Sequence, residues 1–246
     1  MTHLRFALLP IAMLCAAPAA AAERSIVVTS FDRLRVEGPF DVRVTTRTAP
    51  SARIEGTVRA ADGVAVRVEG TTLIVTAGPK GWDEVPVVGK PGTPIVYLGT
   101  LSLRGAAVIG GGRVTVDGPL RGQRIDLQVT GSGGLTIGAL DADQVNATVL
   151  GSGRMTLGGR GARVRLIASG ASTIDAGALR GDDVTVRLDG AGAIAAGARY
   201  TADAISTGIG AVTIYGKPAC RVKAAAGGPI SCGEIAAPPT NTPPVK

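Results

Sequence analysis

The stretch that decides the fold is residues 131–170, GSGGLTIGALDADQVNATVLGSGRMTLGGRGARVRLIASG. It opens on the turn Gly131-Ser132-Gly133, which returns as Gly151-Ser152-Gly153 and again at Gly170. Similar turns begin further along the chain at Gly190, Gly208 and Gly227. A glycine turn that recurs about every 19 residues is typical of repeat proteins, in which each unit stacks on its neighbours.

Alignment on these glycines shows four columns of apolar residues. One column follows the turn: Val114, Leu135, Met155, Ile174, Ile194, Val212 and Ile230. Another lies in the second half of each unit: Ile125, Val145, Val164, Val184, Ala202 and Val222. Side chains two apart on a strand share a face, so each column predicts one inward face repeated at every level, with levels about 4.8 Å apart. The sequence therefore predicts an all-β chain, a parallel β-solenoid of coils of about 19 residues.

Residues 26–76 also alternate apolar and polar side chains, but at uneven spacing, with turns at Gly38-Pro39, Asp62-Gly63 and Glu69-Gly70. They predict a less regular strand region that leads into the coils. Helical repeats do not fit the 36 glycines. A leucine-rich repeat would need a recurring Asn or Cys, and a β-sandwich would not need aligned columns.

The chain divides into three parts. Residues 1–22 predict a secretion signal, with an apolar run followed by the cleavage-type sequence Ala20-Ala21-Ala22. Residues 23–235 form a single solenoid domain with an inserted loop at 77–94, and 236–246 form a proline-rich disordered tail. We expect an exported protein, periplasmic or at the cell surface, with no transmembrane segment in the mature chain.

The formal net charge is +7. Export argues against nucleic acid as the partner, and leaves an envelope polysaccharide or another envelope protein. The one histidine, His3, lies in the signal, so Ser-His-Asp and Cys-His arrangements and histidine zinc sites are excluded from the mature chain. No catalytic residue, cofactor or metal ligand is predicted.

Candidate partner-binding residues lie on a predicted outward polar face. One column there is Arg124, Gln144, Arg163, Asp183, Thr201 and Arg221, and beside it runs Asp126, Asn146, Arg165, Thr185, Asp203 and Lys223. The candidates on this face are Arg124, Arg163, Arg165 and Arg221. Trp82, in the inserted loop, is a further candidate, either as an aromatic partner contact or as a hydrophobic cover of the solenoid.

Two cysteines close the last predicted coil. Cys220 and Cys232 share inward parity and lie twelve residues apart. In an oxidising compartment we expect a disulfide that staples the open end of the core, against the alternative of two buried thiols.

The start FDRLRVEGPFDV at residues 31–42, the recurring Gly-Ser-Gly turns and the ending IYGKP at 214–218 resemble the exported bacterial domain called putative auto-transporter adhesin, head GIN domain. The resemblance covers residues 26–234. It implies a right-handed β-helix, and it brings no established catalytic or binding residues.

These observations favour a non-enzymatic exported protein that presents an elongated surface for binding or adhesion. Two alternatives stay open. One is a carbohydrate-active β-helix enzyme acting on acidic polysaccharide, and the other is a structural protein that self-assembles through an open strand edge.

Overall fold

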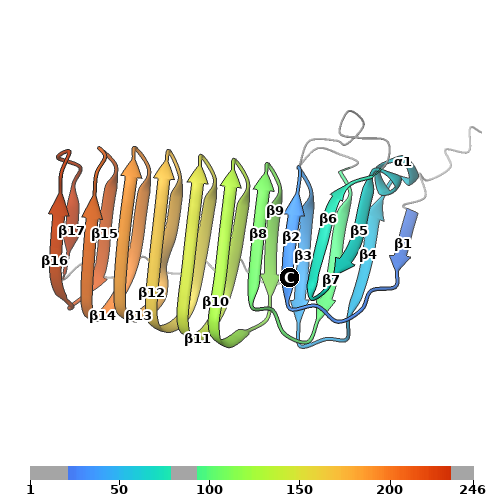
Figure 1. Ribbon diagram of the computed structural model, residues 1–246, viewed down its shortest axis with the longest axis horizontal. Coiled ribbons are helices and arrows are strands. Elements are labelled where there is room, and N and C mark those ends of the chain that lie inside the picture. Colours follow the sequence, from blue (N-terminus) through green and yellow to red (C-terminus); the bar gives the residue numbers. More distant parts are fainter. Residues whose placement is uncertain (1–21, 79–92, 234–246) are drawn as a thin grey trace, which may run out of the picture.

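The computed structural model describes residues 22–78 and 93–233, and within them seventeen strands form one continuous sheet that winds into a β-solenoid (Figure 1). Figure 1 shows the chain rising on the near side, crossing over and returning on the far side as it advances toward the C-terminus, which is a right-handed winding. The prediction of an all-β solenoid is confirmed.

Five long strands make the regular coils: β10 (Leu120–Gly131), β11 (Gly134–Gly151), β12 (Arg154–Gly170), β13 (Thr173–Gly190) and β14 (Ala193–Ser206). They pair in parallel along their lengths. The longer of these strands run along both the far and the near side of the solenoid. In β11, for example, the first part pairs with β9 (Arg113–Asp117) and the rest pairs with β10. One such strand therefore supplies a far-side and a near-side segment of its coil.

The last coil is shorter and has three separate strands, β15 (Ala211–Gly216), β16 (Ala219–Ala224) and β17 (Ile230–Cys232). β16 pairs with β14, and β17 pairs with β15. Among the described residues nothing pairs with the outer edges of β16 and β17, so the solenoid ends in an open edge.

The glycine turns explain why the coils can stack so closely. Gly131, Gly151, Gly170 and Gly190 have φ values of 107°, 110°, 91° and 121°. Side chains other than glycine rarely adopt this region. Space is also short, because a Cβ added to Gly151 would lie 2.7 Å from the carbonyl oxygen of Gly131 in the coil below. Glycine is required there both by the backbone angle and by the neighbouring coil.

The predicted inward columns are buried in the regular coils. Leu135, Met155 and Ile174 are each at most 1% exposed, and Ile125 and Val145 are 0% exposed. A further inward column, which the alignment on the turns did not single out, lies just before each glycine: Val129, Val149, Ala168, Leu188 and Ser206. Small and branched aliphatic side chains thus fill the regular coils, whereas Phe31 and Phe40 are buried in the N-terminal region.

The predicted alignment of the last coil is wrong by two residues. Ala202 pairs with Cys220 and Ala204 with Val222, so the spacing between the coils here is 18 residues rather than 20. Val222 is 52% exposed because no described coil covers it. The same shift moves Arg221 out of its predicted column.

The N-terminal region is less regular, as predicted. Its elements are β1 (Ala22–Ile26), β2 (Arg33–Glu37), β3 (Asp41–Thr46), β4 (Ser51–Gly56), α1 (Val58–Asp62), β5 (Val64–Glu69), β6 (Thr72–Ala77), β7 (Ile95–Thr100) and β8 (Gly105–Gly110). The predicted strands are present, and a short helix precedes the predicted turn at Gly63. Three antiparallel pairs end the solenoid on this side: β1 with β4, β4 with β7, and β5 with β6.

The order of coils along the axis differs from their order in the chain. β2 pairs with both β6 and β8, and β3 pairs with both β7 and β9. The coil made by β2 and β3 therefore lies between two coils that follow it in sequence. Buried Thr100 secures the crossing at the end of β7, because its single hydroxyl hydrogen lies between two carbonyl oxygens, that of Phe31 at 2.6 Å and that of Ser102 at 3.1 Å.

Candidate functional site

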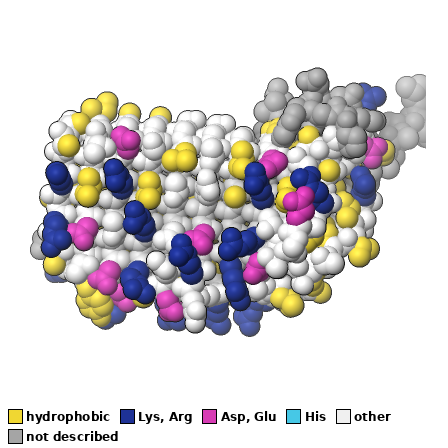
Figure 2. All heavy atoms as spheres, in the orientation of Figure 1, with side chains coloured by type: hydrophobic (Ala, Val, Ile, Leu, Met, Phe, Trp, Pro, Cys, Tyr) yellow, Lys and Arg dark blue, Asp and Glu magenta, His cyan; other side chains and the backbone are white. Residues whose placement is uncertain are grey.

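The candidate binding residues lie on the face that looks toward the viewer in Figures 1 and 2. We call it the arginine face, and define it as the outward residues of β8, of the second halves of β10 to β14, and of β16. Figure 2 shows basic side chains spread along this face with acidic ones interleaved. Three columns of paired residues run across it at right angles to the strands.

The corrected register places the candidates in these columns. The first is Arg124, Gln144, Arg163, Asp183, Thr201 and Ala219; the second is Asp126, Asn146, Arg165, Thr185, Asp203 and Arg221; the third is Gln128, Thr148, Ile167, Arg187, Ile205 and Lys223. Arg221 thus sits beside Asp203, and its guanidinium lies 3.5 Å from that carboxylate.

Arg124 is also held by an acidic neighbour. Its Nε donates to Asp126 Oδ1 at 3.0 Å, and Asn146 Nδ2 donates to the same oxygen at 2.8 Å. Burial works to raise the pKa of Asp126, but the hydrogen bonds from Asn146 and Arg124, with the positive charges of Arg124 and Arg33, lower it below its ordinary value. Asp126 is therefore a fixed negative charge at neutral pH.

Arg163 and Arg165 differ from the other two candidates. Among the described residues no carboxylate lies within 4.0 Å of either guanidinium, and the same is true of Arg187, which the sequence did not single out. Arg165 lies between Asn146 and Thr185 in its column, and Arg187 lies between Ile167 and Ile205. We call Arg163, Arg165 and Arg187 the basic cluster.

The acidic side chains nearest to the basic cluster in sequence and register bind threonines instead. Asp183 Oδ1 accepts a hydrogen bond from Thr201 at 2.6 Å, and Asp189 Oδ1 accepts one from Thr207 at 3.0 Å. Three guanidinium groups against two carboxylates leave a local surplus of positive charge.

The basic cluster has a geometry suited to anionic groups. Arg163 and Arg165 are two residues apart on β12, about 7 Å, and Arg187 follows on the next strand, about 4.8 Å further along the axis. A free guanidinium binds carboxylate, sulfate or phosphate through two parallel hydrogen bonds. Three of them in this arrangement fit a ligand with repeated negative groups.

The signal for this division is present in the sequence. An acid two residues after an arginine on a strand shares its face, and such pairs are bonded at Arg35–Glu37, Arg53–Glu55, Arg67–Glu69 and Arg124–Asp126. In Arg163-Val164-Arg165 that position holds a second base. Residues Arg163 and Arg165 were predicted by their column, but this spacing is what separates them from Arg124.

A second row of arginines, Arg121, Arg160 and Arg180, lies at the edge below the arginine face, and two of the three share one carboxylate. Asp141 accepts hydrogen bonds from Arg160 Nε at 2.7 Å and Nη2 at 3.0 Å, and Arg121 lies 3.5 Å away. The hydrogen bond from Arg160 lowers the pKa of Asp141, and the same contact raises the pKa of Arg160. This row therefore also carries a surplus of positive charge, since Arg180 has no carboxylate within 4.0 Å among the described residues.

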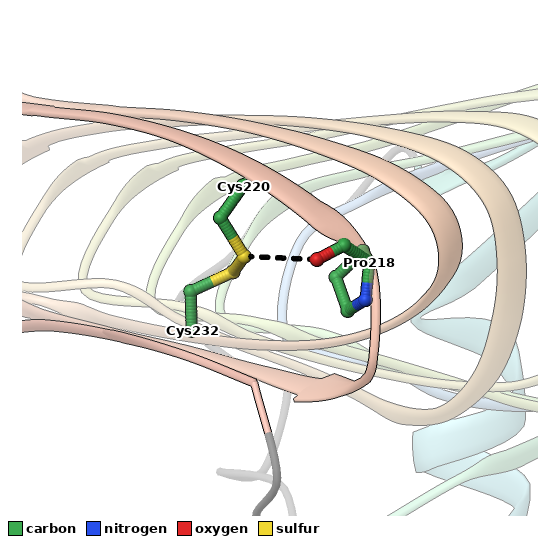
Figure 3. The surroundings of a disulfide bond; sticks show 3 residues. All are labelled: Pro218, Cys220 and Cys232. Atoms are coloured by element: carbon green, nitrogen blue, oxygen red, sulfur yellow. Dashed lines mark hydrogen bonds between the residues drawn. A yellow bond between two sulfur atoms is a disulfide. The ribbon is translucent and has the colours of Figure 1, made fainter.

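The predicted disulfide is present. Cys220 from β16 and Cys232 from β17 are joined across the open end, with their Cα atoms 6.5 Å apart (Figure 3). The Cys220 sulfur lies 3.5 Å from the carbonyl oxygen of Pro218. The bond ties the near and far layers together at the place where no further coil holds them.

Several sequence predictions fall outside the described residues. These are Trp82, the signal segment 1–21, loop residues 79–92 and the tail 236–246. Ala22, the last residue of the predicted signal, is the first residue of β1. Within residues 22–78 and 93–233 no helix is long and apolar enough to cross a membrane, and no group of three or more His, Cys, Asp or Glu side chains is placed to hold a metal ion.

A family model described as putative auto-transporter adhesin, head GIN domain, matches residues 30–218. No curated protein matches the chain. Among solved structures, the chain is similar to a putative adhesin from Bacteroides fragilis, with a TM-score of 0.78 and 23% identity over 87% of this chain and 97% of that one.

Two structures from Parabacteroides distasonis are also similar over 87% of this chain. One is described as a putative adhesin, with a TM-score of 0.69 and 16% identity over 98% of its own length. The other is described as a putative lipid binding protein, with a TM-score of 0.70 and 18% identity over 97% of its own length. At these identities the likeness concerns the fold.

Proposed function

Since this chain belongs to the putative auto-transporter adhesin, head GIN domain family, we propose that it is an exported, non-enzymatic protein that binds an anionic polymer of a cell envelope on its arginine face. The observation that carries the proposal is the basic cluster. Its three guanidinium groups are exposed and have no carboxylate within 4.0 Å among the described residues, while Arg124 and Arg221 on either side are ion-paired.

Export is supported by the family and by the disulfide. Disulfides form and persist in oxidising compartments and are rare in the cytosol. The bond between Cys220 and Cys232 secures the least supported coil. A protein that keeps its open end together in this way is suited to an extracytoplasmic place.

The enzymatic alternative has less support. A glycoside hydrolase needs a carboxylic acid whose pKa is raised so that it can protonate the leaving group. Among the residues that the structure describes, the carboxyl groups with a shifted pKa are Asp126 and Asp141, and arginine and amide partners lower the pKa of both. Such groups stay ionised and act as hydrogen-bond acceptors.

Self-assembly through the open edge is disfavoured by charge. Two copies could meet by pairing their β16 strands antiparallel, with Val222 of one copy opposite Val222 of the other. Arg221 of each copy would then lie opposite Lys223 of the other copy, and the two like-charge pairs would repel. Both side chains are exposed and point outward. Basic residues on an edge strand are a known protection against edge-to-edge pairing.

The proposal is tested by replacing Arg163, Arg165 and Arg187 with alanine together. Ion pairs at exposed sites contribute about 0.5–1 kcal/mol each, so the triple variant should bind an anionic polymer roughly 10- to 150-fold more weakly. Immobilised polygalacturonate and polyphosphate serve as probes, with dextran as the neutral comparison. Binding should also weaken with added salt.

A matched control removes the same charge elsewhere. Arg59, Arg113 and Arg154 are exposed, lie off the arginine face and have no carboxylate within 4.0 Å among the described residues. Their triple alanine variant should keep wild-type binding. Two results would contradict the proposal. Equal losses of affinity in both triple variants would show that only the net charge of the protein matters. Binding to anionic phospholipid vesicles, with no binding to either polymer, would show that the ligand is a lipid.

A further inference from the structure

The arginine face has a hollow of about 390 Å³ on its N-terminal side, next to the basic cluster. Its floor is the first part of β8, where the outward residues are Gly105 and Ala107; the third outward residue of β8, Ile109, does not line the hollow. In register, Gly105 lies between Arg33 and Asp126, and Ala107 lies between Arg35 and Gln128. Long side chains thus stand on both sides of the first part of β8, which has almost none on this face, and this difference in side-chain size creates the hollow.

The walls of the hollow offer both donors and acceptors. Arg33 supplies a guanidinium group on one side, where Arg35 is already paired with Glu37. Gln128 and Thr148 supply an amide and a hydroxyl on the other side. Gln128 Nε2 donates to Thr130 at 3.2 Å, which directs the amide. A ligand in this place meets neutral hydrogen-bonding groups beside positive charge.

Asp126 limits which anionic polymer fits. Its carboxylate lines the hollow and is held in place by Arg124 and Asn146. A carboxylate accepts hydrogen bonds from hydroxyl groups but repels a phosphate. A polymer whose every unit is a phosphate would place a negative group against it, whereas a sugar would place hydroxyls there.

The hollow and the basic cluster are connected by the columns of the face. From Arg33 the second column passes through Gly105, Asp126 and Asn146 to Arg165. Four steps of about 4.8 Å make this distance roughly 19 Å. A polymeric ligand that lies across the strands along this column would therefore contact Arg33, then the hollow with its polar walls, and then Arg165.

We propose that the hollow over Gly105 and Ala107 is a saccharide subsite, and that the ligand of the arginine face is a linear acidic polysaccharide lying along the solenoid axis. Its sugar hydroxyls occupy the hollow, and its carboxylate or sulfate groups bind the basic cluster on one side and Arg33 on the other. This inference rests on the proposed function, because it names the class of polymer that the same face binds.

The test fills the hollow without touching the core. Ala107 is half-buried and points outward, so Ala107→Leu adds an apolar side chain on the floor. A matched control is Ala195→Leu, an equally half-buried position on the opposite face between Asp175 and Thr213. Gln128→Ala is a second variant, at an exposed side chain, which keeps the test valid should Ala107→Leu fail to fold.

Binding is measured by calorimetry on the full mature chain, with oligogalacturonates long enough to span about 19 Å and with polyphosphate as the charged probe without hydroxyls. We expect Ala107→Leu and Gln128→Ala to weaken oligogalacturonate binding roughly 10-fold, a change of about 1.4 kcal/mol. Ala195→Leu should leave it unchanged. Neither hollow variant should weaken polyphosphate binding.

Two results would count against the subsite, and they differ in what else they overturn. If the hollow variants bind oligogalacturonate as tightly as wild type while the triple variant of the basic cluster does not, the subsite is wrong and the proposed function is retained. If the basic-cluster variant also binds like wild type, both are wrong. Wild-type binding of polyphosphate in preference to every acidic oligosaccharide would likewise overturn the polysaccharide inference alone.

Discussion

The structure gives four glycines that separate two reasons why glycine is needed. At Gly151, φ is 110° and an added Cβ would lie 2.7 Å from the Gly131 carbonyl oxygen. Gly70 has φ of 59° with nothing within 4 Å of such a Cβ. At Gly153 the backbone is ordinary, but a Cβ would lie 2.7 Å from both the Gly133 carbonyl oxygen and a methyl of Val129. At Gly138 neither restriction applies.

Alanine at each of the four positions should therefore give a graded series of stabilities. The positive φ costs about 1–2 kcal/mol for a residue with a Cβ. The overlap with the coil below costs about 1–3 kcal/mol, because backbone of two coils has to move apart. We expect losses of about 2–5 kcal/mol for Gly151→Ala, 1–3 for Gly153→Ala and 1–2 for Gly70→Ala. Gly138→Ala should change stability by less than about 1 kcal/mol, in the stabilising direction.

Urea unfolding followed by circular dichroism measures the free energy of unfolding of each variant. Gly138→Ala is the control for the substitution itself, since it changes the same atoms where neither angle nor space is restricted. The reasoning fails if Gly151→Ala is no more destabilising than Gly138→Ala. It also fails in part if Gly153→Ala is neutral, since the coils would then be able to separate without loss.

Three other predictions concern the ends and the charges. Replacing Cys220 and Cys232 by serine should lower the free energy of unfolding by about 3 kcal/mol, measured in urea, and reductant should then have no further effect. Thr100→Val should cost about 1–3 kcal/mol, because a buried carbonyl oxygen loses its donor. Asp126 and Asp141 have lowered pKa values in the folded protein, so their contribution to stability is present above the unfolded pKa near 4 and is lost as the pH falls through the folded values. The melting temperature of the double variant Asp126→Asn, Asp141→Asn should therefore decrease less than that of the wild type as the pH falls below about 4.

Much of the fold follows from the sequence because two signals reinforce each other. The glycine period sets the length of a coil, and the alternation of apolar residues sets which side chains point inward. Residues such as Leu135 and Met155 satisfy both signals, and both are buried. In the regular coils from β10 to β14, the predicted columns are confirmed.

The register of the last coil could not be predicted from these two signals. A shift of two residues leaves every side chain on the same face, so alternation cannot distinguish Val222 opposite Ala202 from Val222 opposite Ala204. The structure has the second arrangement. Only the coil length decides between them, and it shortens to 18 residues at this point.

The candidate site could be predicted only in part. The outward column identified Arg163 and Arg165, but it placed Arg124 and Arg221 with them as equals. Their ion pairs with Asp126 and Asp203 depend on side-chain reach and, for Arg221, on the register of the last coil. Arg187 was missed because it lies in a third outward column, which the alignment of the sequence did not consider. Its separation from Asp189, which binds Thr207, is visible only in the structure.

The position of the coil formed by β2 and β3 has a consequence for how the chain folds. Its four neighbouring strands, β6, β7, β8 and β9, come from residues 72–117, so this coil gains its partners only after those residues are available. Beyond β9, every new coil pairs with the one 17–21 residues before it. Formation of the first part therefore requires distant segments to meet, which is slow, while the remainder can grow by short-range additions from a completed template. Removal of coils from the C-terminal end should shorten the protein in steps, whereas removal of residues 33–46 would leave two coils with no partner between them.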